Sequence, residues 1–216
     1  MLTTLLLGAV DNTEVRTLKV NGILDTQGTT TITRTIKPYG EMSYVIHDNW
    51  GKNDTWTETL VQSDASVLLQ HSFKWVKPKG NNSLWSTKIV DGVAQWRAEE
   101  YEGEAIEGGW RATKLSAGAV GDASLWWWSL VAPKTGDKVE RNRFVPMFGY
   151  ESEVVTYLGD SELTFGATSV NTHKVQRSSP TLTLIVWLDD VGMPLRREFY
   201  RSGSSSIHRA DVWVQK

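Results

Sequence analysis

The chain has 216 residues, enough for one large β domain or two small ones. Its 40% hydrophobic and 22% charged residues are those of an ordinary globular protein, which excludes a disordered chain. The formal net charge of −2 gives no electrostatic reason to expect nucleic acid, and a cysteine count of 0 excludes disulfides, thiolate metal sites and a cysteine nucleophile.

The N-terminal run MLTTLLLGAV is apolar but has neither a basic n-region nor an A-x-A-like cleavage site. Residues 1–10 are therefore either the remnant of a signal peptide or a first strand. No stretch approaches the roughly 20 apolar residues that a transmembrane helix requires, so we expect no transmembrane segment.

The first hundred residues read as a series of short strands. Runs such as TTTITRTIKPYG, EMSYVIHD and SLWSTKIV are rich in threonine, valine and aromatic residues, and each ends in or near Gly, Asn, Asp or Pro. This spacing predicts an antiparallel meander. No proline- or serine-rich linker separates the two halves, so we interpret residues 1–216 as a single β domain.

The segment GDASLWWWSL, residues 121–130, is the one helix that the sequence predicts. Asp122 can cap it and Pro133 follows its end. Three adjacent tryptophans span about 200° of a helix, so such a helix is apolar nearly all round and must be buried. A strand is the alternative, with Trp126 and Trp128 on one face and Trp127 on the other.

The hairpin TLTLIVWLDDVGMPLRREFY is the clearest element of the second half. Leu184, Val186 and Leu188 share one face of its first strand, whereas Ile185 and Trp187 share the other. Residues 189–192 form the turn. Pro194 at the start of the return strand indicates either an edge strand or a bulge.

This half of the chain resembles a family of exported bacterial β-rich domains of unknown function. The resemblance covers roughly residues 83–213 and rests on the apolar helix, a P-x-x-G-D turn at 133–137, a strand pair around 150–158 and 169–175, and WLDDVGMPLR at 187–196. The family is distantly similar to half-barrel lipoprotein carriers of the Gram-negative envelope. The resemblance implies a long curved antiparallel sheet, a half-barrel or open barrel, wrapped around one apolar helix.

No motif in the chain predicts a catalytic centre. The histidines lack the spacing of a metal site, and no Gly-x-Ser-x-Gly or phosphate-binding loop occurs. The glutamates between Glu99 and Glu104 lie near tryptophans, as in glycoside hydrolases, but a charge run is usually a solvated face. Arginines near the C-terminus can bind an anion or pair across strands with Glu198, Asp189 and Asp211, and we favour the pairing.

We therefore expect a β domain of the periplasm or cell envelope that binds or shields a hydrophobic or amphiphilic ligand such as a lipid or lipopeptide, and we favour a non-enzymatic role over an enzymatic one. We expect no cofactor, no metal and no nucleic-acid partner; ligand identity and oligomeric state stay open. The alternatives are a carbohydrate-binding or hydrolytic module using exposed tryptophans and the Glu99–Glu104 cluster, and a purely structural or interaction domain. The candidate ligand-binding residues are Trp96, Trp110, Trp126, Trp127, Trp128 and Trp187.

Overall fold

A computed structural model of the protein describes most of the chain. The described residues are 12–22, 27–37, 40–50, 53–61, 68–76, 82–90, 93–101, 111–114, 132–145 and 149–213. Within these ranges the chain forms strands and contains no helix. The strands are β1 (Asn12–Gly22), β2 (Gln27–Ile36), β3 (Met42–Trp50), β4 (Asn53–Val61), β5 (Leu68–Val76), β6 (Asn82–Val90), β7 (Val93–Tyr101), β8 (Arg111–Lys114), β9 (Lys138–Val145), β10 (Gly149–Phe165), β11 (Thr168–Ser178), β12 (Leu182–Leu188), β13 (Pro194–Arg201) and β14 (Ile207–Trp213).

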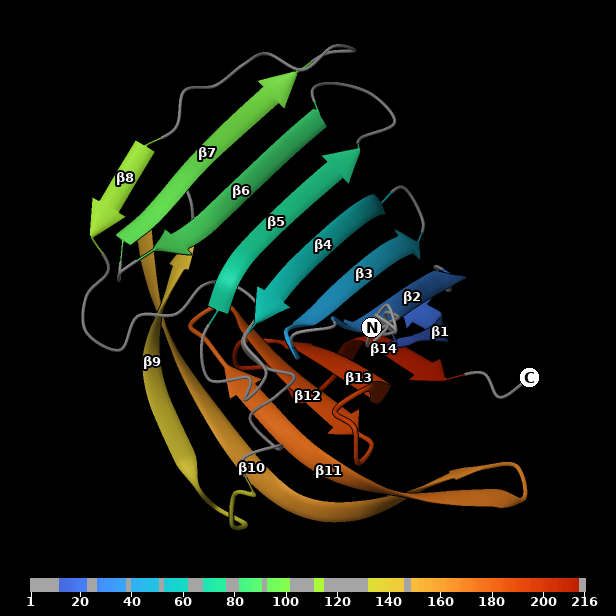
Figure 1. Cartoon of the computed structure of the whole chain (residues 1–216). Coiled ribbons are helices and arrows are strands. Elements are labelled where there is room, and N and C mark those ends of the chain that lie inside the picture. Colours follow the sequence, from blue (N-terminus) through green and yellow to red (C-terminus); the bar gives the residue numbers. More distant parts are fainter. Residues whose placement is uncertain are drawn as a thin grey trace, which may run out of the picture.

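All of these strands belong to one 14-stranded antiparallel sheet, which confirms the all-β prediction. Its order is β8-β7-β6-β5-β4-β3-β2-β1-β14-β13-β12-β11-β10-β9. The sheet therefore consists of two meanders, and the pairing of β1 with β14 joins them (Figure 1). This seam brings the first and the last described strands side by side in the middle of the sheet.

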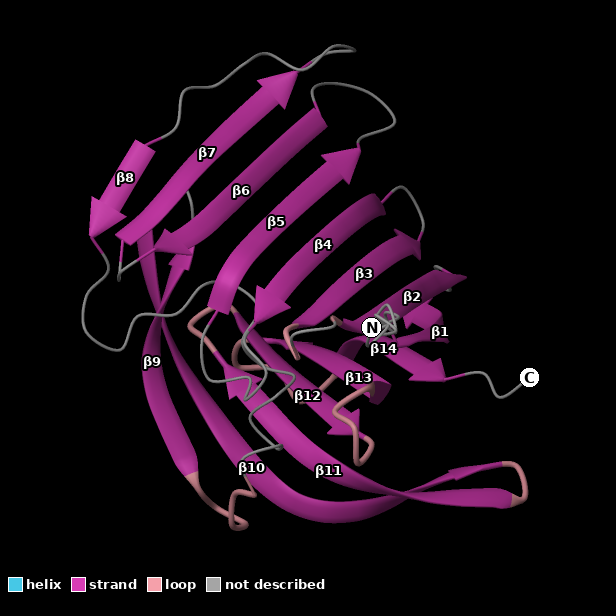
Figure 2. Cartoon of the chain, in the orientation of Figure 1, coloured by secondary structure: helices cyan, strands magenta, loops and turns pink. Residues whose placement is uncertain are grey.

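The sheet curls until its two edges approach each other, as Figure 2 shows. The Tyr150 hydroxyl on β10 donates a hydrogen bond of 3.2 Å to the backbone oxygen of Lys114 on β8. Since β8 is one edge of the sheet and β10 lies next to the other edge, this hydrogen bond joins strands from opposite ends of the strand order. The architecture is therefore barrel-like.

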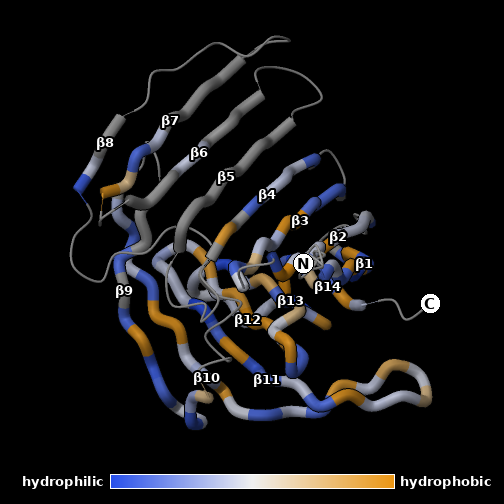
Figure 3. The backbone as a smooth tube through the Cα atoms, in the orientation of Figure 1, coloured by the Kyte–Doolittle hydropathy of each residue, from blue (hydrophilic) through white to orange (hydrophobic). Residues whose placement is uncertain are grey.

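Strand alternation gives the sheet an apolar concave face. Buried side chains from β1 to β3 pack against buried side chains from β10 to β12 and from the β12–β13 connection. Figure 3 shows the matching alternation of hydrophobic and hydrophilic residues along β10 and β11. The buried cluster consists of Leu18, Ile32, Met42, Tyr44, Ile46, Val155, Tyr157, Val175, Leu184, Val186, Leu188 and Met193. Burial of so much apolar surface is the main favourable term that holds the curl in place.

The predicted hairpin at 181–200 is confirmed as β12 and β13, and its turn lies at residues 189–192 as expected. Pro194 lies opposite Leu188 where the register shifts after Trp187. β13 has a neighbour on both sides, so of the two alternatives the structure shows the irregularity and not an edge strand. Because proline has no backbone N–H group, it fits at a position where the regular hydrogen-bond ladder is already interrupted.

The strand expected around 150–158 is longer in the structure and continues to Phe165 as β10. The register shifts between Tyr157 and Gly159, and Gly159 has φ of +100°. A bulge at a glycine lets the strand continue past a residue that breaks the alternation. β10 and β11 therefore form a long hairpin whose tip extends beyond the rest of the sheet (Figure 1).

Two predicted features lie outside the described residues: the apolar run at 1–10 and the helix at 122–130. The interpretation of 1–216 as a single domain stays a prediction. Among the described residues, none forms a helix of the length and hydrophobicity needed to cross a membrane.

Candidate functional site

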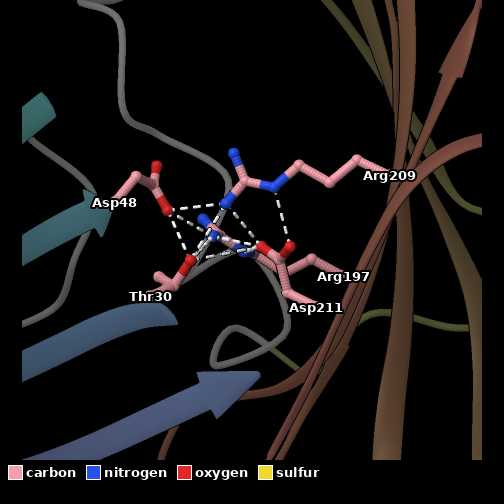
Figure 4. A network of polar contacts seen from close by, with 5 residues as sticks. All are labelled: Thr30, Asp48, Arg197, Arg209 and Asp211. Atoms are coloured by element: carbon pink, nitrogen blue, oxygen red, sulfur yellow. Dashed lines mark hydrogen bonds and ion pairs between the residues drawn. The ribbon is translucent and has the colours of Figure 1, made fainter. Parts of the chain in front are cut away.

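A network of charged side chains lies on the concave face where the two meanders meet (Figure 4). We call Thr30, Asp48, Arg197, Arg209 and Asp211 the arginine–aspartate network. Thr30 and Asp48 face each other across β2 and β3, and Arg197 faces Asp211 across β13 and β14. Residues more than 140 positions apart in sequence are thereby brought into contact, as the 149-residue separation of Asp48 and Arg197 shows.

Asp211 is the anchor of the arginine–aspartate network. Its carboxylate is 0% exposed and accepts hydrogen bonds from both guanidinium groups. Arg197 donates through Nε at 2.8 Å and through Nη2, and Arg209 donates through Nε at 2.7 Å and Nη2 at 2.9 Å. Both oxygens of Asp211 are thus occupied by charge-assisted bonds, which are the strong kind.

Asp48 uses only one of its oxygens in the network. Oδ1 accepts hydrogen bonds from the Thr30 hydroxyl, from Arg197 Nη2 at 2.8 Å and from Arg209 Nη2 at 2.7 Å. Within the described part of the chain, Oδ2 has no hydrogen-bond partner. The Asp48 side chain is 18% exposed, whereas that of Asp211 is fully buried.

The mutual attraction of the arginines and aspartates keeps these side chains ionised. Burial by itself raises the pKa of Asp48, but the charges of Arg197 and Arg209 and the hydrogen bonds from Thr30 and Arg209 outweigh it and hold that pKa well below its usual range. Burial lowers the pKa of Arg197, and the nearby Asp211 and Asp48 carboxylates more than compensate. Two cations and two anions therefore form a buried cluster without net charge, in which no group is activated as a nucleophile.

A second set of contacts holds the β12–β13 turn against the concave face. Arg16 on β1 forms an ion pair of 2.7 Å with Asp189, and Arg34 on β2 donates a hydrogen bond of 2.5 Å to the backbone oxygen of Val191. Asp189 Oδ1 accepts the backbone N–H groups of Val191 at 3.1 Å and Met193 at 2.8 Å, which shapes the turn. Met193 is 0% exposed, so the turn inserts a side chain into the apolar cluster.

A third cluster joins Tyr157, Asp160 and His173 beside the bulge of β10. The Tyr157 hydroxyl donates to Asp160 Oδ1 at 2.6 Å, and His173 Nδ1 lies 2.8 Å from the same oxygen. Burial, followed by the hydrogen bond to Asp160, raises the pKa of Tyr157 to about 12. A phenol that is so hard to ionise is a poor nucleophile or base near neutral pH.

The two candidate tryptophans that the structure describes lie on opposite faces. Trp96 is on the concave face, 9% exposed, and donates its indole N–H to Thr113 at 3.0 Å. Trp187 is on the convex face, 7% exposed, with the Lys174 ammonium 4.7 Å and the Arg196 guanidinium 5.2 Å from its ring centre. These two residues therefore do not form one site, and neither offers an open ring for sugar stacking. Trp110, Trp126, Trp127 and Trp128 lie outside the described residues, as do the side chains of the Glu99–Glu104 cluster.

The predicted cross-strand pairing of the C-terminal arginines is confirmed for Arg197 with Asp211, but the pair is buried and not on the surface. Sequence reasoning missed Asp48, because Asp48 followed by Asn49 is typical of the start of a turn. In the structure Asp48 lies within β3, where its pairing with Thr30 and Thr55 continues the ladder. The sequence did offer one indication: if the strand continues through Asp48, alternation places this carboxylate on the same face as Ile46, where a charge needs a partner. Among the described residues no group of three His, Cys, Asp or Glu side chains is placed to hold a metal ion.

Comparison with known proteins supports the fold and goes no further. No family model and no curated protein matches the chain. The crystal structure of a β-barrel-like protein of domain of unknown function DUF1849 from Brucella abortus is similar, with a TM-score of 0.57 over 93% of this chain and 95% of that chain, at 10% identity. The chain thus shares its fold with a bacterial β domain of unknown function, as the sequence resemblance implied.

Proposed function

We propose that the protein is a non-enzymatic binding domain of the cell envelope that holds an amphiphilic ligand, such as a lipid or lipopeptide, against the concave face of its sheet. In this proposal the curled sheet wraps around the apolar helix expected at 122–130, as in the half-barrel lipoprotein carriers that the sequence distantly resembles. The barrel-like curl supports the proposal because it creates a long concave surface with an apolar lining.

One observation carries the proposal: an apolar position of the concave face lies on the edge strand and is accessible there. Val155 on β10 is 0% exposed, whereas Val139, its partner on the edge strand β9, is 38% exposed. Both side chains point to the same face because they are directly paired. An apolar chain has a surface to contact at this edge, next to the buried cluster.

The test is a matched pair of substitutions. Val139→Lys places a charge on the accessible part of the concave face, and Val15→Lys places the same charge on the convex face, where Val15 is 60% exposed. Titration with a fluorescent long-chain fatty acid, with native mass spectrometry as a second readout, should show saturable binding by the wild type. We expect Val139→Lys to weaken binding by about tenfold or more, because a charge against an alkyl chain loses hydration. Val15→Lys should bind like the wild type.

Two results would count against this function. Absence of any fatty-acid or lipopeptide uptake would favour a purely structural domain, which agrees with the close packing of the described apolar cluster. Equal losses in both valine variants would show that the concave face is not the binding surface. An oligosaccharide panel in the same titration tests the carbohydrate alternative.

A further inference from the structure

We propose that Asp48 Oδ2 accepts a hydrogen bond from the polar head group of the ligand, so that the domain selects amphiphiles whose head group carries an N–H or O–H donor. This inference rests on the proposed function and names the part of the ligand that the arginine–aspartate network recognises. It would make the network a specificity site as well as a structural connection.

The asymmetry between the two aspartates is the first observation. Asp211 commits both oxygens to the arginines, whereas Asp48 commits Oδ1 alone. In Figure 4 the second oxygen of Asp48 points away from the other labelled side chains. A carboxylate held in position by two guanidinium groups and a hydroxyl, with one oxygen accessible, is a preorganised acceptor that loses little side-chain entropy on binding.

The position of Asp48 along the sheet is the second observation. Ile32 faces Ile46 across β2 and β3, and the next inward pair along the same strands is Thr30 and Asp48. The first pair belongs to the apolar cluster and the second to the arginine–aspartate network. Successive inward positions are about 7 Å apart, so the lining changes from apolar to charged within one step. Ile32 and Ile46 are 1% and 7% exposed, whereas the Asp48 side chain is 18% exposed, so Asp48 is the accessible side chain at this boundary and a polar head group reaches it first.

The charge balance decides which head groups fit. The network holds two arginines and two aspartates, so it has no excess positive charge to attract a simple anion. Its accessible atom is an acceptor, which rewards a donor such as a primary ammonium or a hydroxyl. A quaternary ammonium has no N–H group and cannot make this bond.

The experiment compares phosphatidylethanolamine and phosphatidylcholine with identical acyl chains, each displacing the fluorescent fatty acid from the full chain. We expect the wild type to prefer the ethanolamine lipid by about tenfold, the effect of one charged hydrogen bond. Asp48→Asn should abolish the preference, because an amide N–H in place of Oδ2 donates and does not accept. Asp54→Asn, the same change on the convex face of the next strand, should keep it.

The outcomes separate the two proposals. Binding of both lipids with equal affinity by the wild type overturns the role of Asp48 and leaves the proposed function standing. Binding of neither lipid and no fatty acid overturns the proposed function itself. If Asp48→Asn does not fold, Asp48→Glu preserves the charge while moving the acceptor, and an unchanged preference in that variant would contradict the assignment. Soluble glycerophosphoethanolamine should compete at least about a hundredfold more weakly than the lipid, and equal potency would show that acyl chains are not part of the ligand.

Discussion

Asp211→Asn is the substitution that should damage this fold most for the smallest change in shape. The Asp211 carboxylate is 0% exposed and is the shared acceptor of Arg197 and Arg209. Removing one partner of a buried ion pair leaves uncompensated charge and costs about 3–5 kcal/mol. Because Asp48 still contacts both guanidinium groups, we expect the lower end, about 3 kcal/mol. For a domain of this size that corresponds to a fall in Tm of about 6–12 °C.

Urea unfolding followed by circular dichroism and tryptophan fluorescence measures this loss as a lower midpoint with an unchanged slope. Asp54→Asn is the matched control, since the Asp54 side chain is 35% exposed and pairs with His47 at 2.7 Å on the convex face. Exposed ion pairs contribute at most about 1 kcal/mol, so the control should stay within that range. Equal losses in the two variants would refute the argument that burial of the network decides its contribution.

Three further predictions concern acid stability, the bulge and the turn. The pKa of Asp48 lies below its ordinary value of about 4, so its contribution is present above pH 4 and is lost as the pH falls below it; Asp48→Asn should flatten the acid limb of a stability–pH curve. Gly159→Ala should destabilise the protein more than Gly166→Ala. Both glycines have positive φ, so a side chain costs about 1–2 kcal/mol at either position. A Cβ at position 159 would also lie 2.6 Å from a threonine hydroxyl oxygen, whereas nothing lies within 4 Å of a Cβ at position 166. Thermal melts should show this order, and the reverse order would contradict it. Asp189→Ala removes an ion pair and the acceptor of two backbone N–H groups, so we expect a loss of about 2–4 kcal/mol, against little change for Asp190→Ala, whose side chain is 89% exposed.

The arginine–aspartate network and the contacts of the β12–β13 turn both connect the first meander to the second, at two places along the β1–β14 seam. Thr30 and Asp48 come from the first meander, and their arginine partners come from the second. Arg16 and Arg34, also from the first meander, hold the β12–β13 turn of the second. Since β1 and β14 provide the backbone ladder between these contacts, the two meanders are joined by hydrogen bonds, buried charge and apolar packing together.

The sequence by itself determined the properties that depend on near neighbours. Alternation along the chain predicted the strand content, the common face of Leu184, Val186 and Leu188, and the turn at 189–192, because side-chain direction and turn chemistry are local. The structure added that this face is the buried one. It also favoured cross-strand pairing of the C-terminal arginines with nearby carboxylates, and the structure shows Arg197 paired with Asp211 in this way.

Only the tertiary structure decided which distant strands pair. The register of β1 against β14, the curl that brings Tyr150 to Lys114, and the arrival of Asp48 beside Arg197 depend on contacts across most of the chain. No local pattern specifies such contacts, because their free energy comes from closing the sheet and burying both halves at once. For the same reason Asp48, in a stretch of sequence that is typical of a turn, is a partly buried member of the charged network in the folded protein.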